Sequence, residues 1–175
     1  MIALEAEIPE VTLQPGELHL AQSTMVLQTI LGSCVGITFW CKRIGAGAMC
    51  HGVLPRRPAA TREDAPESGN RRYVDYCIRY LARKFDELGA RRGEVEVKVF
   101  GGSDVLPILG LQRDRPTVGA LNAQTAMEVL AAEGFEILAY DLGGNRGRKI
   151  QFHTGTGTVD VFRIDAWGVR YEAVS

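Results

Sequence analysis

The chain has 175 residues, of which 46% are hydrophobic and 23% are charged, a composition typical of a folded globular protein. Twenty Lys and Arg residues oppose 21 Asp and Glu residues, so the formal net charge of -1 favours neither nucleic acid nor an anionic membrane as partner. No apolar run approaches the roughly 20 residues that span a bilayer, and residues 1–17 lack a secretory signal pattern. We therefore expect a cytoplasmic protein without membrane insertion.

Short apolar runs between glycine clusters predict the strands. Runs of about 4–8 apolar residues bounded by turn residues are typical of buried strands. By this criterion the expected strands cover residues 25–31, 34–41, 46–54, 95–100, 135–140, 149–152 and 158–164.

Two segments have a helical period instead. Over residues 71–89 the apolar residues step by four, three, four and three, and Gly89 is suited to end the helix. The second helix is expected over residues 118–133, with Thr117 as a candidate N-cap. The side chains that share one face in the first helix are Val74, Ile78, Leu81, Phe85 and Leu88, and in the second Ala123, Met127 and Leu130.

The order of these elements predicts one α+β domain over residues 1–175, in which two main helices cover one face of a long mixed sheet. Residues 1–15 form an N-terminal extension. Residues 55–70 contain three prolines and balanced charges without an apolar period. They are expected to form a flexible surface loop, either a bare linker or a lid beside a site.

Four cysteines are candidates for chemistry, at positions 34, 41, 50 and 77. No pair has the C-x-x-C spacing of a redox or zinc motif, so free thiols are expected in a reducing compartment. A free cysteine taken alone is most often a small buried hydrophobe. We interpret Cys41, Cys50 and Cys77 in that way.

Cys34 differs because it follows Leu31-Gly32-Ser33 and begins a predicted strand. A turn at a strand end leaves backbone N–H groups unpaired, and such groups can hold an oxyanion. His51 lies on the next predicted strand, where it could serve as the base that a nucleophilic cysteine needs. The residues leave two interpretations open, a Cys34–His51 catalytic pair or two ordinary buried side chains.

Two other types of site are disfavoured. Cys34, Cys50 and His51 could supply three metal ligands, but consecutive residues of a strand point to opposite faces. The basic, glycine-rich segment 143–149 could cradle a phosphate, but it lacks the P-loop pattern and is interpreted as a tight turn. We expect neither a metal nor a cofactor.

Several motifs together resemble one known family, the chemoreceptor glutamine deamidases of bacterial and archaeal chemotaxis, called CheD. The similar segments are L-G-S-C-V-G at 31–36, A-M-C-H-G-V-L-P at 48–55, V-F-G-G-S at 99–103, V-G-A-L-N at 118–122 and D-L-G-G-N-R-G-R at 141–148. In this order they make a specific combination that covers nearly the whole chain, from about residue 16 to residue 171.

The resemblance implies a fold, an activity and partners. The fold is a three-layer α/β sandwich similar to the catalytic domains of deamidating bacterial toxins. The activity is that of a protein-glutamine glutaminase, a hydrolase that converts glutamine side chains on cytoplasmic receptor helices to glutamate. Cys34 matches the nucleophile and His51 the base, with the Ser33 and Cys34 backbone N–H groups as the expected oxyanion hole. A CheC-type phosphatase is an implied regulatory partner, and a monomer is expected.

The third catalytic residue departs from the family pattern. The family has a Thr six residues before the Cys, a position that Gln28 occupies here, whereas Thr29 lies one residue later. One step along a strand reverses the facing side. Strand periodicity therefore favours Gln28 over Thr29 as the partner of His51, and a third possibility leaves the position unfilled.

The displaced Thr keeps alternative functions open. A weakly catalytic or non-catalytic adaptor could bind receptors or the phosphatase without deamidating a substrate. A peptidase could use the same Cys34–His51 pair on a backbone amide.

Overall fold

A computed structural model describes residues 7–60, 67–105, 115–165 and 168–171. The strands in these residues are β1 (Glu10–Thr12), β2 (Leu18–Ala21), β3 (Val26–Leu31), β4 (Val35–Cys41), β5 (Ala46–Gly52), β6 (Glu96–Gly101), β7 (Ile137–Leu142), β8 (Gly147–His153), β9 (Val159–Asp165) and β10 (Gly168–Tyr171). The helices are α1 (Glu67–Asn70), α2 (Val74–Glu87), α3 (Val118–Ala132) and the short 3₁₀ helix η1 (Arg92–Glu94).

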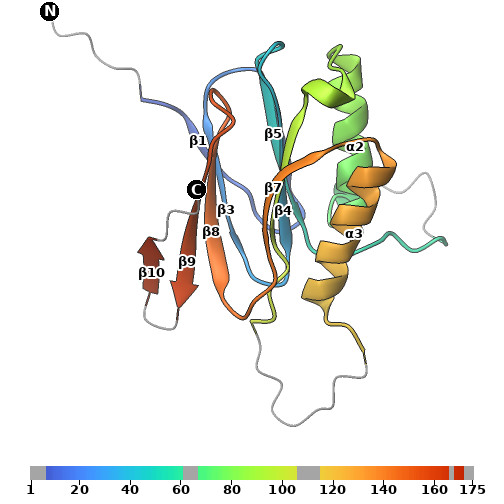
Figure 1. Ribbon diagram of the computed structural model, residues 1–175, viewed down its shortest axis with the longest axis vertical. Coiled ribbons are helices and arrows are strands. Elements are labelled where there is room, and N and C mark those ends of the chain that lie inside the picture. The colour runs from blue at the N-terminus through green and yellow to red at the C-terminus, as the bar shows by residue number, and fades with distance from the viewer. Residues whose placement is uncertain (1–6, 61–66, 106–114, 166–167, 172–175) are drawn as a thin grey trace, which may run out of the picture.

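The described strands form two stacked sheets rather than one long sheet. The outer sheet has the order β1-β3-β8-β9-β10 and the inner sheet the order β2-β5-β4-β6-β7. Figure 1 shows α2 and α3 on the face of the inner sheet that points away from the outer sheet. The predicted α+β class, the three layers and the two main helices are confirmed. The prediction of one long sheet was wrong, because the order of strands along the chain does not reveal which strands pair. β3, for example, pairs with β8, which lies far along the chain.

Each sheet is mixed, as predicted. In the outer sheet β1 runs parallel to β3, and in the inner sheet β6 runs parallel to β7, whereas the other pairs are antiparallel. Two apolar clusters hold the layers together, one between the inner sheet and the helices and the other between the two sheets. All seven residues of β5 are buried because this strand is covered on both faces.

The helix caps and the period of α2 are as predicted. α2 buries its apolar stripe, and Gly89 adopts the left-handed conformation at φ 79° just beyond its end. The Thr117 side chain accepts a hydrogen bond of 3.2 Å from the Ala120 N–H and so caps α3 as expected. No helix among the described residues has the length and apolar character needed to cross a membrane.

The buried face of α3 differs from the predicted one. Ala123 and Met127 are only partly buried, whereas Asn122 and Thr125 are buried. An assignment based on hydrophobicity could not find two polar side chains on the inward face. The amide of the buried Asn122 reaches the Ser33 carbonyl, which lies next to Cys34.

The segment 55–70 is attached to the helices at its start. Arg56 makes a salt bridge of 2.5 Å with Glu128 of α3, and the Arg57 N–H donates to the Asp75 carboxylate of α2 at 3.0 Å. The segment ends in α1, which the sequence did not predict. Residues 61–66 lie outside the described residues, so the lid or linker role stays a prediction.

Candidate active site

Cys34 lies in the turn between the two sheets. β3 of the outer sheet ends at Leu31, and β4 of the inner sheet begins at Val35, so residues 32–34 carry the chain across. The Cys34 side chain is partly exposed, whereas the other three cysteines are buried. Cys34 is therefore the thiol that a substrate can reach, and we refer to residues 32–34 as the nucleophile loop.

The carbonyl groups of the nucleophile loop are all held by hydrogen bonds from the protein. The Ser103 N–H donates to the Gly32 oxygen at 2.9 Å, and the Gly102 N–H donates to the Cys34 oxygen at 2.8 Å. The Asn122 side-chain amide donates to the Ser33 oxygen at 2.9 Å. The Ser33 and Cys34 N–H groups, by contrast, donate to no other residue in the part of the chain that the structure describes.

Gly101 permits this close approach. Its φ is 104°, a conformation that side-chain-bearing residues rarely adopt, and a Cβ built there would lie 2.2 Å from the Cys34 oxygen. Only glycine fits this position. The two glycines of the V-F-G-G-S motif therefore serve to hold the nucleophile loop.

His51 lies on β5 with its side chain between the two sheets. The imidazole is only 2% exposed, and its Nδ1 lies 2.8 Å from the Thr29 Oγ1 of the outer sheet. The Thr29 hydroxyl donates its proton to the Leu13 carbonyl at 2.8 Å. Because that hydroxyl has one proton, it can only accept from His51, which makes Nδ1 the protonated nitrogen. The Nε2 atom then carries the free lone pair.

The Nε2 atom of His51 is buried and has no hydrogen-bond partner among the described residues. In the antiparallel β4–β5 register, Val35 pairs with Gly52 and Gly36 pairs with His51. Cys34 lies two residues before Gly36, so it lies diagonally across from His51 on the same face. Cys34 also packs against the apolar cluster between the sheets, on the side to which His51 points. The register and the packing place Cys34 and His51 on the same side of neighbouring segments, and the two side chains share no hydrogen bond. Their action as a catalytic pair stays a prediction.

Burial sets the protonation of this pair. Desolvation lowers the pKa of His51 to about 4, against weaker opposing effects of the Leu13 carbonyl and the Glu17 charge. Burial also raises the pKa of the Cys34 thiol, and its own backbone N–H opposes this shift. At neutral pH the resting pair is thus a thiol and a neutral imidazole, not a thiolate and an imidazolium.

Thr29, not Gln28, contacts His51, so the prediction for the third position was wrong. The Gln28 side chain points away from the histidine and bonds Thr12 at 3.1 Å and Gln151 at 3.0 Å within the outer sheet. The prediction placed the partner of His51 six residues before Cys34, at the family spacing, and so turned Thr29 to the other face of the strand. In the structure that other face, which also carries the buried Leu27 and Leu31, is the one that meets His51.

The metal site considered from the sequence is not assembled. Cys50 lies in the cluster between the inner sheet and the helices, and His51 points the opposite way. Among the described residues, no three His, Cys, Asp or Glu side chains lie close enough to hold a metal ion.

The basic turn at 143–149 is a structural clamp. The Arg148 side chain is 1% exposed and donates to the carbonyls of Asp141 and Gly143 and, at 3.0 Å, to the Ser103 hydroxyl. The single proton of the Ser103 hydroxyl lies within hydrogen-bond reach of the Arg146 carbonyl at 2.8 Å and of the Gly143 carbonyl at 3.1 Å. Arg148 therefore fixes the Gly101–Ser103 turn against the segment that leads into β8, which confirms the interpretation as a turn.

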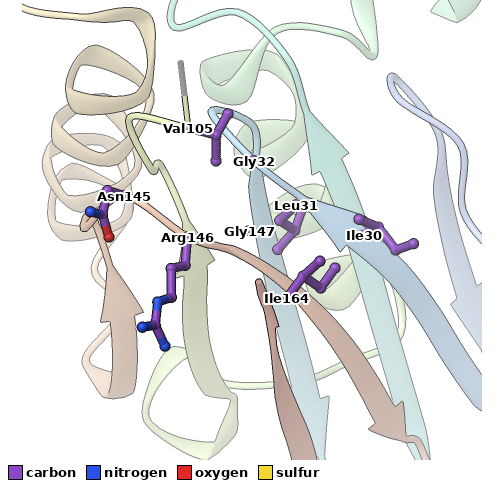
Figure 2. Close-up of a pocket in the computed structure, with 8 residues that line it drawn as sticks. All are labelled: Ile30, Leu31, Gly32, Val105, Asn145, Arg146, Gly147 and Ile164. Carbon is purple, nitrogen blue, oxygen red and sulfur yellow. The ribbon is translucent and has the colours of Figure 1, made fainter. Parts of the chain in front are cut away.

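A pocket of about 510 Å³ opens beside the nucleophile loop. Figure 2 shows its lining, in which apolar side chains of β3 and β9 face the segment that carries Asn145 and Arg146. Ile30 is 62% exposed and Gly32 forms part of the wall. Consecutive Cα atoms are about 3.8 Å apart, so the Gly32 Cα lies no more than about 8 Å from that of Cys34.

Three contributors to the site were not predicted from the sequence. One is a backbone group, the Leu13 carbonyl. The other two are side chains from segments far along the chain, the Asn122 amide and the buried Arg148. The motifs around Asn122 and Arg148 were the only available signal, and they mark similarity without indicating a role.

Comparisons with known proteins identify the family of this chain. Residues 53–163 match the family model described as CheD chemotactic sensory transduction. The chain is 41% identical over 165 residues to a probable chemoreceptor glutamine deamidase CheD 2 of Geobacter sulfurreducens, covering 94% of this chain and 96% of that protein. Proteins named probable chemoreceptor glutamine deamidase CheD from Maridesulfovibrio salexigens and Rhodospirillum rubrum are 34% and 38% identical, covering 92% and 91% of this chain and 95% and 85% of theirs. The resemblance is confirmed, and the chain belongs to the CheD family.

Proposed function

We propose that this protein hydrolyses specific glutamine side chains of a chemoreceptor's cytoplasmic helices to glutamate, with Cys34 as the nucleophile. The observation that carries the proposal is the free Nε2 of His51, fixed as a base by Thr29 beside a partly exposed cysteine. The names of the relatives supply the substrate class, a chemoreceptor glutamine.

The first half of the reaction transfers the acyl group to sulfur. The substrate carboxamide approaches Cys34, and His51 Nε2 takes the thiol proton as the sulfur attacks the amide carbon. The oxygen becomes negative and is held by the Ser33 and Cys34 N–H groups. The imidazolium then gives its proton to the amide nitrogen, ammonia leaves, and a thioester remains on Cys34.

The second half regenerates the enzyme. His51 removes a proton from water as the water oxygen attacks the thioester carbon, and the same proton returns to the sulfur as the C–S bond breaks. The products are a glutamate side chain and the free thiol. Each turnover places a new negative charge on a receptor helix, which changes the repulsion between helices and can bias a two-state receptor.

The assay for this proposal is release of ammonia from a purified receptor cytoplasmic fragment. Ammonia release that leaves the receptor backbone intact supports the deamidase. Shortened receptor fragments would indicate the peptidase, and co-purification with the receptor without ammonia or cleavage would indicate the adaptor. The Thr29–His51 contact supports the deamidase over the adaptor, because His51 has a third group beside it despite the displaced Thr.

Thr29→Val should lower kcat for deamidation by about 10-fold to 100-fold. Valine has nearly the shape of threonine but cannot accept a hydrogen bond from the Nδ1–H group of His51. Gln28→Leu is the matched control on the opposite face of β3 and should leave kcat within about threefold of the parent. Steady-state kinetics of both variants decides between the two positions. A loss of kcat in Gln28→Leu but not in Thr29→Val would instead support Gln28 as the partner of His51.

We propose that the receptor helix docks across the pocket beside the nucleophile loop. One helical turn rises about 5.4 Å, so a helix with its glutamine at Cys34 would present the side chain of the adjacent turn to this pocket. The exposed apolar surface of Ile30 suits an apolar receptor side chain.

Ile30→Asp should therefore raise KM for the receptor by about 10-fold, since a carboxylate would be desolvated against an apolar partner. Leu138→Asp on β7 is a matched control, because Leu138 is 60% exposed and lies in the other sheet. Receptor titrations of both variants are the measurement. Equal KM values for the two would exclude docking at this pocket.

A CheC-type phosphatase remains a proposed regulatory partner, and a monomer remains the expected state. Co-purification of the two proteins tests the first, and sedimentation of the isolated chain tests the second.

A further inference from the structure

Asn122 connects α3 to both halves of the catalytic pair. Its side chain is fully buried in the second turn of the helix. Its amide nitrogen donates to the Ser33 oxygen at 2.9 Å and to the Val53 oxygen at 3.0 Å. Ser33 immediately precedes Cys34, and Val53 lies two residues after His51. Because both acceptors are carbonyl oxygens, only the NH₂ end of the amide can face them.

The Ser33 hydrogen bond also fixes the direction of the Cys34 N–H. The Ser33 carbonyl and the Cys34 N–H belong to one planar trans peptide group, so they point in opposite directions. When Asn122 holds the oxygen from the helix side, the N–H is aimed away from the helix. The neighbouring peptide is held in the same way, because the Ser103 N–H binds the Gly32 oxygen and thereby orients the Ser33 N–H.

The start of α3 is itself fixed against this region. A Cβ at Gly119 would lie 2.6 Å from the Ser103 oxygen and 2.8 Å from the Gly102 oxygen, so only glycine lets the helix approach the Gly101–Ser103 turn this closely. Asn122 follows one turn later. The helix that supplies the amide therefore packs against the same turn that holds the Gly32 and Cys34 carbonyls.

We infer that Asn122 is a positioning residue that orients the Cys34 N–H as an oxyanion donor. This role deepens the proposed function, but it applies to any reaction in which Cys34 attacks a carbonyl. The Asn122 amide does not touch the substrate and acts through the Ser33 peptide.

The test compares two reactions of the Cys34 thiol, neither of which requires a receptor. Acylation by 4-nitrophenyl acetate passes through an oxyanion, whereas alkylation by iodoacetamide does not. Asn122→Ala and Asn122→Asp should each lower the ratio of the acylation rate to the alkylation rate by about 10-fold or more, because loss of one oxyanion donor typically costs 100-fold or more in a full enzyme. The alkylation rate itself should stay within about threefold of the parent.

Val129→Ala is the matched control for loss of stability. Val129 is buried on the same helix and belongs to the cluster between the helices and the inner sheet. This variant should lower the melting temperature and leave the ratio unchanged. The two Asn122 variants carry different risks to folding, because Asn122→Asp keeps the side-chain volume and Asn122→Ala introduces no buried charge. The rate ratio is read from whichever variant folds.

The outcomes separate this inference from the proposed function. A reduced ratio in the Asn122 variants supports the positioning role, even if the parent protein releases no ammonia from the receptor. An unchanged ratio overturns it, even if the parent is an active deamidase. An equal fall of both rates also overturns it, because Asn122 would then support the loop without orienting the N–H.

Discussion

Cys34→Ser is expected to lower the rate of receptor deamidation by about four orders of magnitude, because removal of a nucleophile eliminates nearly all chemical catalysis. Serine is close to cysteine in size, so the melting temperature should change little. The measurement is ammonia release under single-turnover conditions, with the melting temperature of the same preparation as a control for folding.

The reactivity of the four thiols provides an independent check on Cys34. A limiting dose of iodoacetamide should modify Cys34 first, because the other three cysteines are buried. Cys77 is further protected because a hydrogen bond to Cys50 and burial both raise the pKa of its thiol. Peptide mapping that found Cys41 or Cys50 modified first would contradict the assignment.

His51→Ala is expected to lower kcat by about 100-fold or more, the range for a positioned acid and base. In the parent protein, kcat/KM should hold its neutral-pH value down to about pH 5 and fall only near pH 4, where His51 becomes protonated. A pH profile of kcat/KM measures this directly. A fall centred near pH 6.5, or a His51→Ala variant within a factor of a few of the parent, would contradict the role of a buried neutral base.

The same proton links pH to stability. The pKa of His51 is about 4 in the folded protein and 6.5 when unperturbed, so the unfolded chain binds the proton more readily. The stabilisation is therefore complete above pH 6.5 and is lost as pH falls toward 4, by up to about 3 kcal/mol. Urea unfolding should show this loss in the parent, and a smaller pH dependence in His51→Gln. An equal pH dependence of the unfolding free energy in the two proteins would assign the titration to a group other than His51.

The sequence allowed prediction of the residues whose roles depend on nearby elements. Cys34 immediately precedes β4 and His51 lies on β5, the strand that pairs with β4 after a short turn, so strand pairing alone places the two residues on neighbouring segments. The cap at Thr117 and the glycine after α2 are also local features, and both were found. Such features need only the periodicity and turn chemistry of one segment.

The contact between Thr29 and His51 could not be predicted in the same way. Thr29 belongs to the outer sheet and His51 to the inner sheet, so their approach depends on how the two sheets stack. The face of β3 that carries Thr29 is buried between the two sheets, so it meets His51 although the family spacing pointed to Gln28 on the other face. Stacking and loop geometry are tertiary properties that no single segment encodes.

Asn122 illustrates the same limit for a polar residue. Hydrophobic periodicity places polar side chains on the outer face of a helix, yet this amide is buried because two carbonyl groups at the ends of other elements need donors. Its role becomes visible only when the nucleophile loop, β5 and α3 are seen together.

The central claim is that this protein converts receptor glutamine to glutamate through Cys34. The most direct measurement is peptide-resolved mass spectrometry of a receptor cytoplasmic fragment incubated with the parent protein, with Cys34→Ser, or alone. We expect conversion of particular glutamines to glutamate with the parent protein only, and no cleavage of the receptor chain. Equal conversion by Cys34→Ser, or cleavage in place of conversion, would contradict it.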